Sequence, residues 1–185
     1  MTWESLDLRG ADVAELRLFD ARMQDCLFDR ANCAGWRVWV TRVEDCSFVR
    51  ADLRSRGLGG GGPWRGRTTT WRRVDFSRAR LAESHFVGCA LHSSTFDTPG
   101  PRLVIEDCAV TDLVVRGEAR TMIVTGVVDQ AHPPGSRSFT ADLSAATFRD
   151  THVIGYPWTG SPRPDRTTSA SSAIYRRPCR ACSQP

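Results

Sequence analysis

The chain has 185 residues, of which 41% are hydrophobic, and a net charge of +4 in which all 25 basic residues are arginine. This length fits one domain with an appendage. It contains no apolar stretch of about 18 residues, and its first residues lack a basic segment followed by an apolar one, so we predict no membrane span or secretion signal and expect a cytoplasmic protein.

An apolar residue recurs at every fifth position over the first 53 residues, from Leu8 and Val13 to Leu53. A second series of mostly small or apolar residues lies two positions earlier, from Leu6 to Ala51. The residues between the two series are almost all polar. The pattern therefore places two inward positions in each group of five residues.

A period of five fits neither an α-helix nor a single strand. In a helix, five residues advance about 500°, which would scatter the apolar side chains around the axis. In a strand, an odd period would alternate them between two faces. A chain that turns a corner every five residues satisfies the pattern, because four such sides close a coil of about 20 residues and coils can stack at about 4.8 Å. The period thus predicts a four-sided β-helix.

Several segments combine a small residue, Asp and a large apolar residue, among them Ala11-Asp12-Val13, Ala51-Asp52-Leu53 and Ala141-Asp142-Leu143. These segments resemble the pentapeptide-repeat family over roughly residues 4–156. The resemblance implies an all-β fold, a right-handed quadrilateral β-helix with the small and large residues inside. We assign residues 1–156 to this domain.

A glycine-rich segment interrupts the first run. Residues 54–70 contain four consecutive glycines and a proline, which predicts an insertion loop. The period resumes at Trp71. If Leu58 and Trp71 lie on successive sides, four phenylalanines align in one column, which favours a single continuous helix over two domains. The predicted structural core is Leu8, Val13, Leu18, Phe28, Val38, Phe48, Leu53, Phe76, Leu81, Phe86, Leu91, Phe96, Leu143 and Phe148.

The pattern becomes less regular in the second half of the chain. Five-residue spacing holds for Ile105, Val110 and Val115, but the phase of residues 118–129 cannot be assigned. We predict a second loop at 131–136, followed by the last clean repeats. Residues 157–185 are rich in proline, serine and threonine, which predicts a disordered tail.

The charges are segregated along the chain. Residues 1–53 and 74–156 each carry more acids than arginines, whereas residues 54–73 have six arginines and no acid. Arginine interleaved with tryptophan is typical of phosphate or single-strand contacts. The alternative is a solvated loop attracted to the acidic body, and we do not expect direct nucleic-acid binding. The candidate interaction loop comprises Arg54, Arg56, Trp64, Arg65, Arg67 and Trp71.

No motif predicts catalysis, a cofactor or a metal. Cys26 and Cys46 occupy small inward positions, where cysteine packs as an apolar filler. Cys179 and Cys182 form a lone CxxC without the second pair that zinc requires. The glycine run lacks the Gly-Lys-Ser/Thr of a phosphate-binding loop, and outward aspartates such as Asp12 are explained by side-chain hydrogen bonds at turns. We therefore predict a protein that is not an enzyme.

Two functions remain open. The first is a non-catalytic scaffold whose partner is another protein. The second follows from the family resemblance, because some pentapeptide-repeat proteins imitate duplex DNA and bind a type II topoisomerase such as gyrase, which they modulate or protect. Arginines such as Arg17 and Arg37 interrupt the outward rows of the body, and a DNA mimic is expected to be more acidic. We therefore favour the scaffold.

Overall fold

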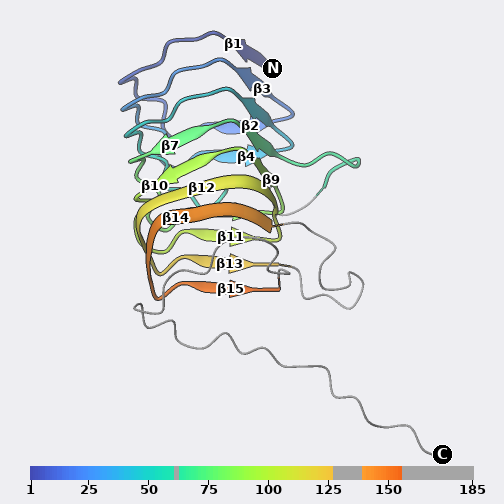
Figure 1. The fold of residues 1–185 in the computed structure, drawn as a ribbon. Helices are drawn as coiled ribbons and strands as arrows, with labels where there is room; N and C mark the ends of the chain where they lie inside the picture. Colours follow the sequence, from blue (N-terminus) through green and yellow to red (C-terminus); the bar gives the residue numbers. More distant parts are fainter. Residues whose placement is uncertain (61–62, 127–138, 156–185) are drawn as a thin grey trace, which may run out of the picture.

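The structure is a computed structural model that describes residues 1–60, 63–126 and 139–155. Within these ranges the chain forms β-strands and no helix, and the strands pair in parallel around a common axis (Figure 1). The predicted all-β solenoid is thus confirmed. The predicted loop at 131–136, the predicted tail at 157–185 and the Cys179–Cys182 motif lie outside the described residues.

Most strands have three residues, because each occupies one side of a coil. In chain order they are β1 (Thr2–Glu4), β2 (Arg17–Phe19), β3 (Arg22–Gln24), β4 (Arg37–Trp39), β5 (Arg42–Glu44), β6 (Thr70–Arg72), β7 (Asp75–Ser77), β8 (His85–Val87), β9 (Ala90–His92), β10 (Thr95–Asp97), β11 (Val104–Glu106), β12 (Ala109–Arg120), β13 (Ile123–Thr125), β14 (Phe139–Arg149) and β15 (His152–Ile154).

The strands stack into four faces, which we call sides 1 to 4. Side 1 contains β1, β3, β5, β6, β9 and the start of β12, and side 2 contains β7, β10 and the middle of β12. β12 continues past the corner at Gly117 onto side 3, and β14 pairs along β12 from Val110 to Arg120. Side 3 is joined by isolated bridges such as Asp12 with Asn32. Side 4 contains β2, β4, β8, β11, β13 and β15. In the first coils the partners are 20 residues apart, as Trp3 and Met23 are on side 1.

The register locates the insertion between Leu58 and Trp71. Val43 pairs with Trp71, which is eight residues more than a regular coil. Gly57 bridges to Arg37, and the Leu58 amide donates to the His85 carbonyl at 3.0 Å. Residues 54–58 therefore still belong to the coil, with Arg54 ending side 3 and residues 55–58 on side 4, so the predicted start of the loop at residue 54 was wrong. Glycine keeps both backbone hydrogen-bonding groups, and a glycine-rich sequence can still stack as a coil.

Two later coils are one residue shorter than the repeat. Phe96 pairs with Val115, and Ile105 pairs with Val124, both at a separation of 19 residues. The shortened sides lie between Phe96 and Ile105 and between Val115 and Val124. This explains why the phase after residue 118 could not be assigned from a strict period of five.

Phenylalanine rings form a continuous column inside side 2. Phe28, Phe48, Phe76 and Phe96 are fully buried, and successive ring centroids lie 4.7, 5.7 and 4.9 Å apart with nearly parallel planes. Trp36 and Trp71 pack edge-on against the same column. Stacked and edge-to-face aromatic pairs add to the stabilisation that burial alone provides.

The remaining predicted core residues divide by their position along the axis. Side chains in the middle coils are fully buried, namely Leu18, Val38, Leu53, Leu81, Phe86 and Leu91. Leu8 and Val13 are only half-buried, because the first coil has no coil before it. Leu143 and Phe148 are also half-buried. The register of β14 shifts twice against β12, and Phe148 faces Ala119 rather than joining the phenylalanine column.

Candidate interaction surface

Side 4 has glycine at two outward positions of its third coil. Gly57 occupies the position next to Arg37, and Gly59 lies between Trp39 and Val87 in the neighbouring coils. A Cβ at Gly59 would come within 2.1 Å of the Val87 carbonyl oxygen, so the backbones approach closely there. The missing side chains open a groove of about 880 Å³ with a glycine floor and with Trp39 and Val87 among its lining residues.

Arginines surround the groove, and they differ in whether a carboxylate pairs with them. Arg54 forms a bidentate ion pair with Asp52 at 2.9 and 2.7 Å, and this pair lowers the pKa of Asp52 below its ordinary value. Arg56 lies 3.7 Å from Glu83, which Arg102 also contacts at 3.0 Å. Within the described residues Arg37 forms no ion pair. Arg37 and the loosely held Arg56 are therefore available to an incoming carboxylate.

A tight hairpin follows the groove in sequence. The amide of Trp64 donates to the Arg67 carbonyl at 2.8 Å, and the amide of Arg67 donates back to Trp64 at 3.0 Å. The two residues at the tip, Arg65 and Gly66, have φ of 51° and 72°. Positive φ at both central residues is the geometry of a type I′ turn, which joins strands through two residues.

Two contacts hold this hairpin against the body. The ring of Trp64 meets Phe19 edge-on at 5.2 Å, and the Arg67 guanidinium donates to both carboxylate oxygens of Asp20 at 2.7 and 3.1 Å. The hydrogen bond from Arg67 lowers the pKa of Asp20. The Arg65 guanidinium lies 4.4 Å above the Trp64 ring, a cation–π contact. Phe19 nevertheless remains 54% exposed and extends the apolar surface of the hairpin.

The structure separates the predicted interaction-loop residues into three groups. Arg54 and Arg56 lie at the groove, while Trp64, Arg65 and Arg67 form the hairpin. Trp71 was wrongly assigned to this loop. It is fully buried in side 1, and its indole nitrogen donates to the Leu58 carbonyl at 3.0 Å, so it closes the core beneath the insertion.

Sequence reasoning missed the body residues that complete this surface. Phe19, Asp20 and Trp39 belong to side 4 or its last corner and not to the insertion. A signal for them was present, because Phe19 and Trp39 are large apolar residues one coil apart at an outward position. Continuing the register to the outward positions would have identified them.

The outward aspartates have the local structural role that the sequence predicted. Their carboxylates accept hydrogen bonds from amides two residues later, as Asp12, Asp75 and Asp142 do at 3.4, 2.8 and 3.0 Å. Asp7 also forms a bidentate pair with Arg9, and this pair lowers its pKa to about 2. These carboxylates therefore support the turns and are partly neutralised by arginine.

The described residues contain no group of three or more His, Cys, Asp or Glu side chains placed to hold a metal. Among these residues, no helix of the length and apolarity of a membrane span occurs. Cys26, Cys33 and Cys46 are buried thiols that form no disulfide. Burial raises the pKa of both Cys33 and Cys46 to about 12, so these thiols stay protonated and pack as apolar groups.

Comparison with known proteins gives structural similarities alone. No family model and no curated protein matches the chain. HetL, a pentapeptide repeat protein involved in heterocyst differentiation regulation in the cyanobacterium Nostoc sp. strain PCC 7120, is 15% identical, with 89% of this chain and 77% of HetL covered and a TM-score of 0.44. QnrB1, a plasmid-mediated fluoroquinolone resistance protein, is 11% identical, with 82% and 81% covered and a TM-score of 0.28.

At these scores neither similarity carries an argument about function, and the fold is established by the molecule's own repeat and register. Two inward side chains per side, sides of about five residues and parallel stacking of successive coils together define a four-sided β-helix. The chain has the pentapeptide-repeat fold, an all-β solenoid with four sides.

Proposed function

We propose that the protein is a non-catalytic scaffold that binds a protein partner through the groove on side 4 and the adjoining hairpin. The observation that carries the proposal is the glycine floor of this groove. Every regular coil presents side chains outward, so a coil that presents Gly57 and Gly59 leaves a recess that nothing in the described residues fills. Recesses with apolar walls and a few polar groups are typical binding sites.

The chemistry of the surface indicates what kind of partner fits. Trp39 and Val87 would contact an apolar side chain that inserts against the glycine backbone. Arg37 and Arg56 would contact carboxylates beside it, because a guanidinium offers bidentate donors to a carboxylate. Phe19 and Trp64 add an exposed aromatic pair, and aromatic and arginine side chains are enriched at interfaces.

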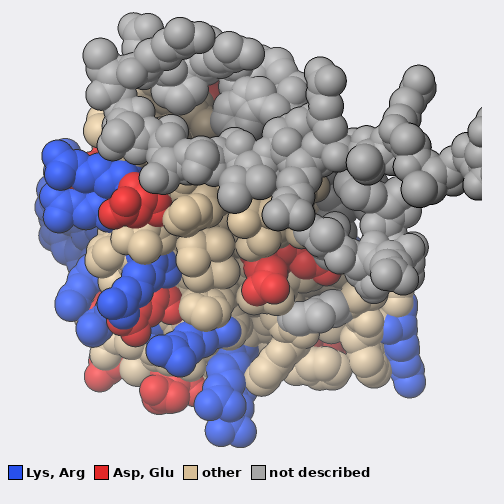
Figure 2. All heavy atoms as spheres, turned by 90° about the horizontal axis from the view of Figure 1, so that it is seen from below, with Lys and Arg blue, Asp and Glu red and all other residues tan. Residues whose placement is uncertain are grey.

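Mimicry of DNA toward a type II topoisomerase receives less support from the geometry. A mimic needs uncompensated rows of carboxylates. Here Asp7 and Asp52 form ion pairs with Arg9 and Arg54. The Arg73 guanidinium donates to both carboxylate oxygens of Asp45 at 2.5 and 2.6 Å. Figure 2 shows acidic and basic groups interspersed over the face viewed from below. Inhibition of gyrase supercoiling by the purified protein would nevertheless replace the scaffold proposal.

The test is an affinity capture with a matched pair of variants. Gly57→Leu fills the groove, and a Cβ at this position meets only ordinary contacts at 3.5 Å or more. Ala109→Leu adds the same side chain at an outward position on side 1 as the control. The wild type and Ala109→Leu should retain a protein that Gly57→Leu loses, with all three folded by circular dichroism. Retention by Gly57→Leu, or no retained protein with the wild type, would overturn the proposal.

A further inference from the structure

A column of arginines follows the corner between sides 2 and 3. Arg30, Arg50 and Arg78 occupy this corner in three successive coils, and the Arg30 and Arg50 amides donate to Val49 and Ser77 of the next coil at 2.9 and 3.0 Å. The guanidinium groups therefore arise from positions about 4.8 Å apart along the axis. A groove of about 600 Å³ runs beside them, on a different edge of the molecule from the glycine groove.

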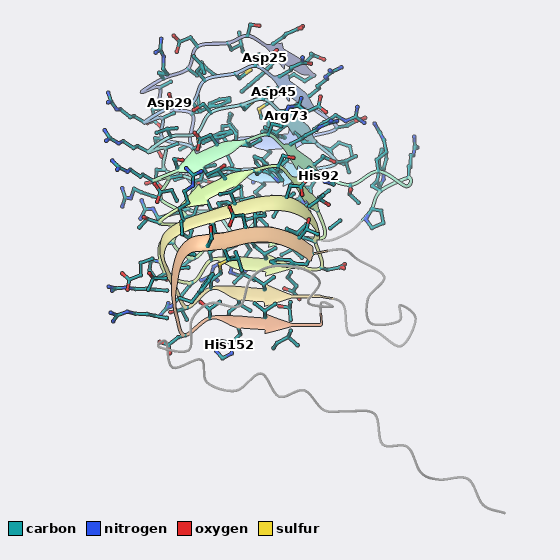
Figure 3. The ribbon with its side chains drawn as sticks, viewed as in Figure 1. Asp25, Asp29, Asp45, Arg73, His92 and His152 are labelled. Carbon is teal, nitrogen blue, oxygen red and sulfur yellow. The ribbon has the colours of Figure 1, made fainter. Side chains whose placement is uncertain are left out.

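The charge of this column is not compensated. None of the three arginines forms an ion pair within the described residues, and all three are exposed. Asp29 lines the same groove, but its carboxylate already accepts from the Val49 amide at 3.1 Å and from the Ser47 hydroxyl. Figure 3 shows nitrogen-tipped side chains projecting from the edge on which Asp29 lies. The groove therefore has a positive rim that its own acid does not neutralise.

The fold does not require arginine at this corner. The three arginines have φ of 60°, 59° and 56°, in the left-handed region that glycine adopts most readily. The first coil has Gly10 at the same corner, and a later coil has Gly117. Thr98 occupies the corner in the fourth coil between these glycines, so the position accepts residues other than arginine. Corner geometry alone would favour glycine or asparagine over arginine at Arg30, Arg50 and Arg78.

We propose that this column binds an acidic, extended segment of a partner protein. An extended chain presents the side chains of one face every 6.6–6.8 Å or so, and long arginine side chains can adapt to that spacing from rows about 4.8 Å apart. Guanidinium groups pair with carboxylates through two parallel hydrogen bonds. No aromatic residue lines the groove, so nucleic-acid bases would find no stacking platform there.

Fluorescence anisotropy of a labelled eight-residue peptide with alternating glutamate and serine tests this site in the full-length protein. The ladder variant carries Arg30→Gln, Arg50→Gln and Arg78→Gln. The control variant carries Arg17→Gln, Arg42→Gln and Arg72→Gln on sides 4 and 1, which removes the same charge elsewhere. Both variants are first shown to unfold at temperatures close to that of the wild type.

We expect the wild type and the control to bind the peptide, the ladder variant to bind at least about tenfold more weakly, and binding to weaken as salt is raised. If both variants lost the same affinity for the peptide, net charge alone would explain binding and the proposal would be overturned. So would the absence of peptide binding by the wild type. Tighter binding of a labelled thymidine oligonucleotide than of the peptide would overturn it in favour of nucleic acid.

Discussion

Replacing Phe48 by alanine tests the stacked column most sharply. Phe48 is fully buried, with Phe28 and Phe76 stacked on its two faces at 4.7 and 5.7 Å and with Trp36 and Trp71 at its edges. A buried Phe→Ala change costs about 3–5 kcal/mol, and removing a ring that is packed on both faces places this one in the upper half of that range. Most domains have about 5–15 kcal/mol of stability in total.

The measurement is urea unfolding of Phe48→Ala against Phe19→Ala. Phe19 is the matched control, because the same ring is removed from an outward position that is 54% exposed. With a urea dependence of about 2 kcal/mol per molar, we expect the Phe48→Ala midpoint to fall by about 2 M, and the Phe19→Ala midpoint by less than about 0.5 M. Similar midpoints for the two variants would refute the assignment of inward and outward positions.

Three further predictions follow from close approaches and pKa shifts. Gly59→Ala should lower the melting temperature far more than Gly57→Ala, because a new Cβ would meet backbone at 2.1 Å at position 59 and only at 3.5 Å at position 57. Equal melting temperatures would contradict the close approach of the coils at Gly59. With Cys179 and Cys182 replaced by serine, a thiol reagent at pH 8 should modify the protein only after denaturant is added, and rapid labelling of native protein would exclude a closed core. Burial raises the pKa of Cys33 and Cys46 to about 12, so the free energy of unfolding should fall as the pH rises above 9.0, the ordinary pKa of a cysteine thiol. Arginine partners lower the pKa of Asp7 to about 2 and also lower that of Asp52. The stabilisation from these pairs is therefore present above pH 3.8, the ordinary aspartate pKa, and is lost as the pH falls through the lowered pKa values of the folded state. Asp52→Asn should flatten this acid dependence in urea unfolding, and an unchanged dependence of stability on pH would show that the Asp52 pair contributes nothing.

The fold was accessible from sequence because its period is a direct consequence of geometry. Five residues per side and two inward positions per side leave little freedom in the register from Leu8 to Leu53. The phenylalanine column followed from that register once the insertion was placed between Leu58 and Trp71. The period could not anticipate sides that are one residue shorter, and these sides occur after Phe96 and Val115.

The candidate site was harder to predict, because binding surfaces depend on what is absent as well as on what is present. The glycines after Arg56 were interpreted as a loop, although Gly57 still stacks as a coil and creates the groove by lacking a side chain. The basic loop was identified by composition, but composition did not distinguish the buried Trp71 from the exposed Trp64. Phe19 and Asp20 are far from the hairpin in sequence and meet it only through the coil register.

Photo-crosslinking from the groove tests most directly the claim that side 4 is the binding surface. A photoreactive amino acid replaces Arg56 at the groove in one variant and Arg42 on side 1 in another, and each is irradiated in cell extract. The scaffold proposal predicts a discrete crosslinked protein from position 56 that is absent from position 42 and is lost when Gly57→Leu is added. The same crosslinks from both positions, or a crosslink at position 56 that survives Gly57→Leu, would contradict it.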